Sequence, residues 1–149
     1  MTVNEITEGR KKELERRKKR LRSYRGHKYE SESIATKIRI LSTEVYSIES
    51  KQIRGMPTSP YTKQDASKVI IELVDLKRKY TKKYEESMME CAEVENAITT
   101  LDDPFQRAIM RNYYINGMNW YDVAEKMNCS RTYAIQQHDE ALEKIKVVH

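Results

Sequence analysis

The sequence has 149 residues, with 34% charged and 38% hydrophobic side chains, only 4 Gly and 3 Pro, and a net charge of +5 at pH 7. This composition leaves too few turn-forming residues for an all-β fold and, with its many Glu, Lys, Arg, Leu and Ile residues, predicts an all-α protein. A single Phe and a single Trp argue against one large globular core, and the positive charge favours a polyanionic partner.

The first expected element is a basic N-terminal helix or arm, residues 1–30. Its residues 10–28 hold eleven Lys or Arg and two Glu, a local charge of +9, so the rest of the chain is net acidic. Gly26 and His27 predict a soft break. Backbone phosphates dominate non-specific affinity for DNA, so this segment is predicted to contact phosphates as a helix or an arm. The alternatives are a solvated charged tail and a bZIP-like basic region. The side chains expected to contact phosphate are Lys11, Lys12, Arg16, Arg17, Lys18, Lys19, Arg20 and Arg22.

Residues 31–100 predict a long antiparallel helical hairpin, coiled-coil-like, with a loop at 55–64. Apolar residues recur at spacings of four and three in both halves, which is the pattern of a coiled-coil seam. The loop contains one glycine and two prolines, which end a helix, and the second helix runs from about Asp65 to Thr99. The first seam consists of Ile34, Ile38, Leu41, Val45 and Ile48. The second seam consists of Ile70, Leu73, Leu76, Tyr80, Tyr84, Met88, Cys91, Val94, Ile98 and Leu101.

A hairpin of two helices is only marginally stable by itself. Tyr, Met and Ile residues lie beside the predicted seam and indicate that a second chain completes the core. We therefore expect a homodimer or a higher oligomer.

Residues 101–149 differ in pattern and predict a helix-turn-helix domain at the C-terminal end. Asp103 occupies the N-cap position of a helix over 104–114, with proline at the first helical position. Gln106 lies three positions after Asp103, which is the spacing of a capping box. Asn116–Gly117 predicts the end of this helix.

Two further helices follow, and each has a predicted cap. Asn119 is expected to cap a short helix from Trp120 to Met127, and Asn128–Cys129 predicts a tight turn. Ser130 is expected to cap the last helix, which extends to about Val147.

The two last helices have complementary faces. A small residue, Ala124, lets them cross closely, as a helix-turn-helix requires. On the short helix the face consists of Trp120, Val123, Ala124 and Met127. On the last helix it consists of Ala134, Ile135, His138, Ala141, Leu142 and Ile145. His138 is expected to be a packed core residue.

In such a domain the last helix enters the major groove and presents its N-terminal residues to base edges. Arg pairs with guanine, Gln with adenine, and Thr or Tyr contacts a thymine methyl group or a phosphate. The residues expected to bind DNA are Arg131, Thr132, Tyr133, Gln136 and Gln137.

The segment from Leu101 to Lys146 resembles the region-4 helix-turn-helix of bacterial sigma factors. The shared pattern comprises Leu101, Arg107, Tyr114, Gly117, Trp120, Val123, Ala124, Ser130, Ala141, Leu142, Lys144 and Ile145. By position, the resemblance implies DNA contacts at Arg131, Thr132 and Gln136. Two features depart from that pattern. Residues 102–149 carry a net charge of −1, and Ile135 occupies a position where sigma factors usually place a polar or basic residue.

From about residue 30 onwards, the hairpin, the GMP-x-S loop and the sigma-like end together resemble the RinA- and ArpU-like late transcription activators of Gram-positive bacteriophages and prophages. The resemblance implies a regulator that activates late genes. We expect sequence-specific binding to double-stranded DNA, with a basic segment that either adds phosphate contacts or touches host RNA polymerase. Two alternatives remain open. One is an oligomeric DNA-packaging protein similar to small terminase subunits, in which the helix-turn-helix usually comes first. The other is a sigma-like RNA polymerase adaptor.

Nothing in the sequence points to catalysis. There is no Ser/His/Asp set, phosphate-binding Gly-rich loop or metal-ligand cluster, so we expect no enzyme activity, no cofactor and no metal. Cys91 and Cys129 lie far apart without a CxxC spacing, which indicates a reducing compartment. No apolar run approaches the ~20 residues of a membrane span, and the N-terminus lacks a signal-peptide pattern. The expected location is the cytoplasm of the bacterial host cell, without membrane contact.

Overall fold

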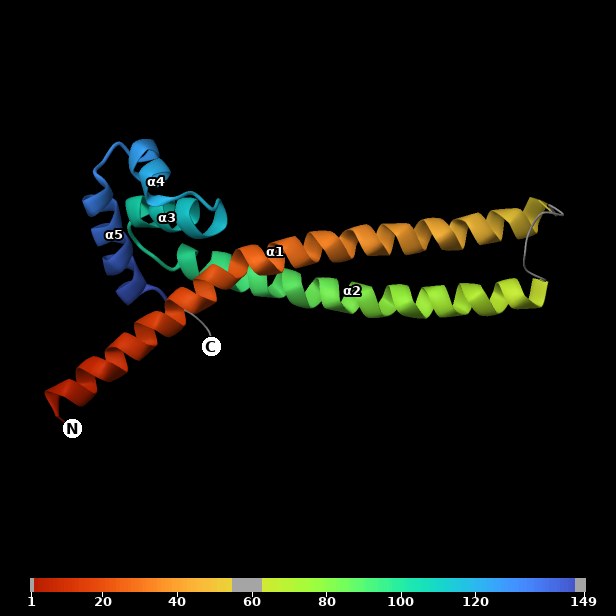
Figure 1. The fold of residues 1–149 in the computed structure, drawn as a ribbon, viewed down its shortest axis with the longest axis horizontal. Helices are drawn as coiled ribbons and strands as arrows, with labels where there is room; N and C mark the ends of the chain where they lie inside the picture. The colour runs from red at the N-terminus through yellow and green to blue at the C-terminus, as the bar shows by residue number, and fades with distance from the viewer. Residues whose placement is uncertain (1, 55–62, 147–149) are drawn as a thin grey trace. The chain divides into compact units, whose positions relative to one another are not determined.

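The computed structural model describes residues 2–54 and 63–146 (Figure 1). These residues form helices and turns and no strands, which confirms the predicted all-α fold. The predicted loop lies largely outside the described residues, and α2 already begins at Lys63. The elements are α1 (Val3–Arg54), α2 (Lys63–Thr99), α3 (Pro104–Met110), the π-helical turn η1 (Arg111–Ile115), α4 (Trp120–Lys126) and α5 (Arg131–Lys144).

Helix α1 continues through Gly26 without interruption, so the predicted break at Gly26–His27 is wrong. A glycine inside a helix costs only about 1 kcal/mol relative to alanine. The buried side chains of Leu21 and Tyr24 on one side of Gly26, and of Ser31 and Ile34 on the other, extend the packed face of the helix past it. Packing on both sides therefore outweighs the local preference.

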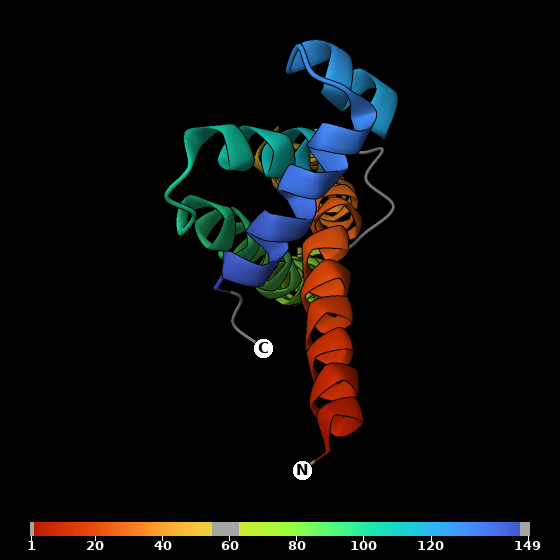
Figure 2. The ribbon, with the colours of Figure 1, turned by 90° about the vertical axis from the view of Figure 1, so that its left-hand side faces the viewer.

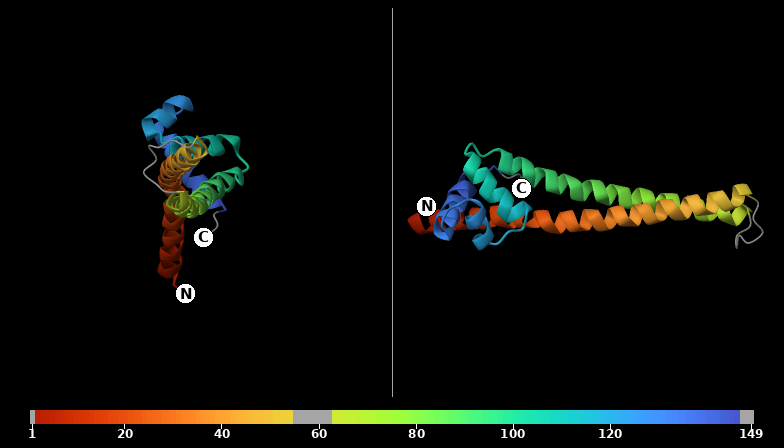
Figure 3. Two further views of the ribbon diagram at one scale, coloured as in Figure 1. Left: turned by 90° about the vertical axis from the view of Figure 1, so that its right-hand side faces the viewer. Right: turned by 90° about the horizontal axis from the view of Figure 1, so that it is seen from above.

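The chain divides into two compact units. The first, which we call the terminal unit, consists of Met1–Lys28 and Met89–His149, and the second, the hairpin unit, consists of Tyr29–Met88. In the hairpin unit the two helices run antiparallel, side by side along their length (Figure 3). Ile34 and Leu41 are buried on α1, and Ser87 of α2 donates a hydrogen bond of 3.3 Å to Glu30.

One predicted seam residue of α2 points outward. Leu76 is 38% exposed, whereas Lys77 is half-buried. The spacing of four and three that passes through Leu73 continues to Lys77 and then Tyr80. Lys77 therefore occupies the seam position, where the aliphatic stem of a lysine can pack while its ammonium group stays in water.

The terminal unit is built around α5, against which both α3 and α4 pack. Figure 2 shows α3, α4 and α5 gathered beside the N-terminal part of α1. The larger of two core clusters joins residues of α1, α2, α3, η1 and α5, and the smaller lies between α3, α4 and α5. The larger cluster consists of Leu21, Tyr24, Cys91, Val94, Ala97, Ile98, Leu101, Met110, Tyr114, Ala141, Leu142 and Ile145. The smaller cluster consists of Ile109, Val123, Ala124 and Ala134.

Among residues 2–54 and 63–146, the structure contains no helix with an apolar stretch long enough to cross a bilayer.

Candidate nucleic-acid interface

Helices α4 and α5 begin at the caps that the sequence predicts. The Asn119 side chain accepts a hydrogen bond of 2.9 Å from the backbone N–H of Asp122. The Ser130 hydroxyl accepts one of 3.1 Å from the N–H of Tyr133. Between the helices, Asn128 has a φ of 53°, a left-handed conformation that Asn tolerates better than most residues. Both predicted caps and the tight turn are confirmed.

The predicted cap of α3 is also confirmed, because Asp103 accepts a hydrogen bond of 2.8 Å from the N–H of Phe105. The reciprocal half of the capping box is wrong. Gln106 is buried, and its Nε2 donates to Gln137 Oε1 at 3.1 Å, so it links α3 to α5. The helical run changes from α to π geometry at Arg111 and continues to Ile115, so the end predicted at Asn116–Gly117 is confirmed, and Gly117 has a φ of 70°.

Helix α5 is shorter than predicted and ends at Lys144, where Ile145 is extended and buried. Arg17 of α1 supplies the reason, because its Nη1 donates to the carbonyl oxygens of Leu142 and Glu143, both at 2.9 Å. The last carbonyl groups of a helix lack partners within the helix, and a cation beside them is stabilising. Arg17 therefore caps the C-terminal end of α5.

The crossing of α4 and α5 is close. Val123, Ala124 and Ala134 are buried against one another, and the N–H of Cys129 donates to the Ala124 carbonyl oxygen at 3.0 Å. Ile135 was expected on this inner face, but it is 39% exposed. Ala134 and His138 define the inward stripe of α5, and Ile135 lies to one side of that stripe.

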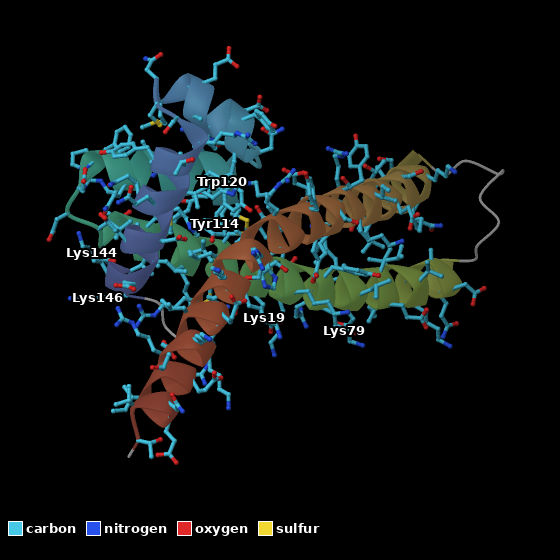
Figure 4. All side chains as sticks on the ribbon, turned by 60° about the vertical axis from the view of Figure 1, so that its left-hand side comes forward. Lys19, Lys79, Tyr114, Trp120, Lys144 and Lys146 are labelled. Atoms are coloured by element: carbon cyan, nitrogen blue, oxygen red, sulfur yellow. The ribbon has the colours of Figure 1, made fainter. Side chains whose placement is uncertain are left out.

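An aromatic layer holds α4 and η1 to α5. The rings of Tyr113 and Trp120 are stacked with centroids 4.2 Å apart, and Trp120 meets the His138 ring edge-on at 5.2 Å. Figure 4 shows Tyr114 and Trp120 close together among the helices of this unit. His138 is buried, as the sequence predicts.

His138 joins Tyr114 and Asp139 in a chain of hydrogen bonds. Burial lowers the pKa of His138, against the opposing effect of Asp139, and burial raises the pKa of the Tyr114 hydroxyl. The neutral imidazole therefore donates from Nδ1 to Asp139 Oδ1 at 2.9 Å and accepts at Nε2 from the Tyr114 hydroxyl at 2.6 Å. The bond to Tyr114 joins α5 to η1, whereas Asp139 lies on α5 itself and orients the His138 ring.

Of the five residues expected to bind bases, Gln137 is half-buried and the other four are exposed, but only two of the five line the open side of α5. Thr132 and Gln136 are exposed, together with Ile135. The three side chains line an open hollow of about 460 Å³ that continues along the helix to Asp139, Glu140 and Glu143.

The other three residues contact neighbouring helices. The Arg131 guanidinium lies 3.9 Å from the centre of the Tyr121 ring of α4, a cation–π contact. Tyr133 packs its ring against Phe105 of α3 at 5.8 Å, and Gln137 accepts the hydrogen bond from Gln106. Arg131 is thus held beside the open surface, whereas Tyr133 and Gln137 help to position α5.

The exposed side of α5 changes charge along its length. Its first turns carry Arg131 and uncharged residues, but Asp139, Glu140 and Glu143 follow on the same side. Arg10 of α1 offsets part of this charge through an ion pair of 2.8 Å with Glu143. Because carboxylates repel phosphates, only the N-terminal turns of α5 are suited to approach DNA.

The eight basic residues expected to contact phosphate fall into distinct groups. Arg17 caps α5, and Arg20 forms ion pairs with Glu90 and Glu93 of α2, so both are engaged inside the terminal unit. Lys11, Arg16 and Lys18 form ion pairs along α1 at 3.8, 3.2 and 3.3 Å. The residues that remain are exposed: Lys12, Lys19 and Arg22, of which Lys19 is labelled in Figure 4.

Tyr121 and Ile135 belong to the open surface, and sequence reasoning did not select either as a functional residue. An aromatic side chain in the first turn of the short helix, close in the fold to the start of the next, was the available signal for Tyr121. The departure of Ile135 from the sigma pattern was the signal for Ile135. Within the described part of the chain, no three His, Cys, Asp or Glu side chains are grouped as a metal site requires.

Comparison with known proteins gives one match. A family model described as "Protein of unknown function (DUF1492)" matches residues 51–146, which include all of α2, α3, η1, α4 and α5. No curated protein and no solved structure matches the chain.

Proposed function

The chain belongs to the family described as "Protein of unknown function (DUF1492)", and we propose that it is a sequence-specific transcriptional regulator that binds double-stranded DNA through α4 and α5. One observation carries this proposal. Two short capped helices cross over small residues, joined by a tight left-handed turn at Asn128, and the N-terminal turns of α5 are exposed. This is the arrangement in which a recognition helix enters the major groove.

Three residues of α5 supply the base contacts. Arg131 pairs with the O6 and N7 atoms of guanine, and Gln136 pairs with the N6 and N7 atoms of adenine. Ile135 offers an aliphatic surface to a thymine methyl group. The Arg131 guanidinium already packs over the ring of Tyr121, so it loses less conformational freedom when it binds a base.

The exposed lysines of α1 add contacts to backbone phosphates, which position the protein without reading sequence. This division of roles supports the activity that the sequence resemblance implies, namely a phage or prophage late-gene activator in the cytoplasm of a bacterial host. Binding alone accounts for that activity, and no catalytic group or cofactor enters the proposal.

A sigma-like RNA polymerase adaptor is the second candidate, and a specific observation favours it. The C-terminal half of the exposed side of α5 is acidic, with Asp139, Glu140 and Glu143 in succession. Such a surface repels DNA but suits a basic protein partner. Tight, specific binding to promoter DNA in the absence of polymerase would exclude an adaptor that binds little DNA by itself.

The test is selection of bound fragments from genomic DNA by the purified protein, at ~150–200 mM salt, where purely electrostatic binding is weak. We expect one enriched motif, to which the double variant Arg131→Ala with Gln136→Ala binds more weakly by about 1–3 kcal/mol for each base pairing removed. Lys79→Ala, an exposed cation of the hairpin unit, serves as the control and should bind normally. Enrichment without a motif, or full affinity of the double variant at normal helicity, would contradict the proposal.

A further inference from the structure

The hairpin unit exposes an unusual number of large apolar side chains. Ile53 is 86% exposed, Tyr46 69% and Ile71 62%, and Val74 is also exposed. Isolated apolar residues on a surface are ordinary, but a contiguous group marks an interaction site. Whether these four side chains form such a group depends on the side of the hairpin on which each lies.

All four lie on the same side. Tyr46, Ile71 and Val74 each come directly after a seam residue, and Ile53 lies one heptad after Tyr46. Successive residues of a helix are rotated by about 100°, so each side chain projects sideways from the seam in the same rotational sense. The two right-handed helices run antiparallel, and positions directly after the seam on α1 and on α2 therefore share one side of the hairpin.

The register brings these residues level with one another. The hydrogen bond from Ser87 to Glu30 fixes the pairing of the two helices. Tyr46 lies as many residues beyond Glu30 as Ile71 lies before Ser87, and both helices rise equally per residue. Tyr46 therefore lies beside Ile71, with Val74 one turn away, and these three side chains form a patch, while Ile53 lies on the same side two turns beyond Tyr46.

The charges on this side favour a second copy of the chain as the occupant. The positions directly after the seam carry two arginines, Arg39 and Arg78, and two glutamates, Glu49 and Glu85. Equal numbers of both signs allow this side to face its own copy without net repulsion, and they give it no attraction for DNA. The positions directly before the seam are richer in charge, and include Lys37, Glu44, Lys51, Glu72, Lys79 and Lys83.

We propose that the hairpin unit dimerises through this side, with the Tyr46–Ile71 patch packed against the same patch of a second copy. A contact between identical surfaces closes after two copies, so the assembly is a dimer and not a ring. Four helices then surround one apolar core, which completes the burial that a lone two-helix hairpin leaves partial.

The test measures the mass of the full chain in solution by sedimentation, without DNA, over a range of concentrations up to tens of micromolar. The patch variant is Tyr46→Glu with Ile71→Glu. The matched control is Ile40→Glu with Leu76→Glu, which places the same charges on two exposed apolar residues directly before the seam. The wild-type protein and the control should be dimers, and the patch variant should be a monomer.

Circular dichroism establishes that each variant keeps its helicity. If the glutamate pair unfolds the hairpin, the variant Tyr46→Ser with Ile71→Ser removes the apolar side chains without adding charge. This variant should still raise the dimer dissociation constant. A monomeric wild-type protein, a ring of more copies, a patch variant that stays dimeric, or equal loss of dimer in the control overturns the proposal. Because no DNA is present, these outcomes do not depend on the proposed regulatory function.

Discussion

His138 connects the packing of α5 to pH. Its imidazole is buried between η1 and α4, accepts a hydrogen bond from Tyr114 and donates one to Asp139. Lys18 and Arg22 of α1 also face it and further disfavour its protonation. A proton on Nε2 would remove the acceptor of the Tyr114 hydroxyl and add a positive charge near those of Lys18 and Arg22.

The free energy of unfolding of the terminal unit should therefore fall as the pH decreases below about 6.5. Burial lowers the pKa of folded His138, so the unfolded chain binds more protons below that pH and gains stability relative to the folded state. Above the unfolded pKa this contribution is fully present. Urea denaturation followed by fluorescence measures the effect, because Trp120 is the single Trp and its ring lies 5.2 Å from that of His138.

The variant His138→Gln is the control for other titrating groups. A glutamine amide still offers an acceptor to Tyr114 and a donor to Asp139 but does not titrate in this range. The denaturation midpoint of wild type should fall more than that of the variant between about pH 7.5 and pH 5. Parallel curves for the two proteins would show that His138 does not carry the pH dependence.

At the scale of elements, local signals and tertiary packing determined different features. Asp103, Asn119 and Ser130 were predictable as caps because each satisfies backbone N–H groups only two or three residues away. The end of α5 was not predictable, because Arg17, far away in the sequence, caps it. The same limit applies to Gln106, whose partner lies on another helix.

Two glycines with opposite roles provide a test of the helix boundaries. Gly26 lies inside α1, and a Cβ added there would meet no atom within 4 Å. Gly117 has a φ of 70°, and its added Cβ would lie 2.4 Å from the Arg25 side chain, which must then move. We expect Gly26→Ala to stabilise the terminal unit by about 1 kcal/mol and Gly117→Ala to destabilise it by about 1–2 kcal/mol.

Urea denaturation followed by Trp120 fluorescence compares both variants with wild type. The two changes in the free energy of unfolding should have opposite signs. These signs are more informative than the magnitudes, because both substitutions add the same methyl group. If Gly26→Ala destabilised the unit, α1 would be interrupted there, as the sequence pattern alone suggested.

For the molecule as a whole, the sequence indicated where positive charge gathers but not which charges face outward. Eight basic residues of residues 10–28 were equivalent candidates for phosphate contact, because spacing along one helix does not reveal which side packs on its neighbours. The fold separates them. Arg17 and Arg20 bind carbonyl and carboxylate oxygens of the terminal unit, whereas Lys12 and Lys19, one heptad apart, share the exposed side of α1.

The dependence of DNA affinity on salt should reveal this separation. Under the proposed function, Lys12→Ala and Lys19→Ala each remove one cation that contacts a phosphate, so each should weaken binding to all sequences alike and reduce the slope of log K against log salt by about 1. Arg20→Ala removes the same charge but should leave that slope unchanged and lower the stability of the unit, since it abolishes the ion pairs with Glu90 and Glu93. Fluorescence anisotropy with a labelled operator, at several salt concentrations, measures all three. A slope that fell equally in Arg20→Ala would mean that α1 leaves α2 when the protein binds DNA, and that the +9 segment acts as a free arm.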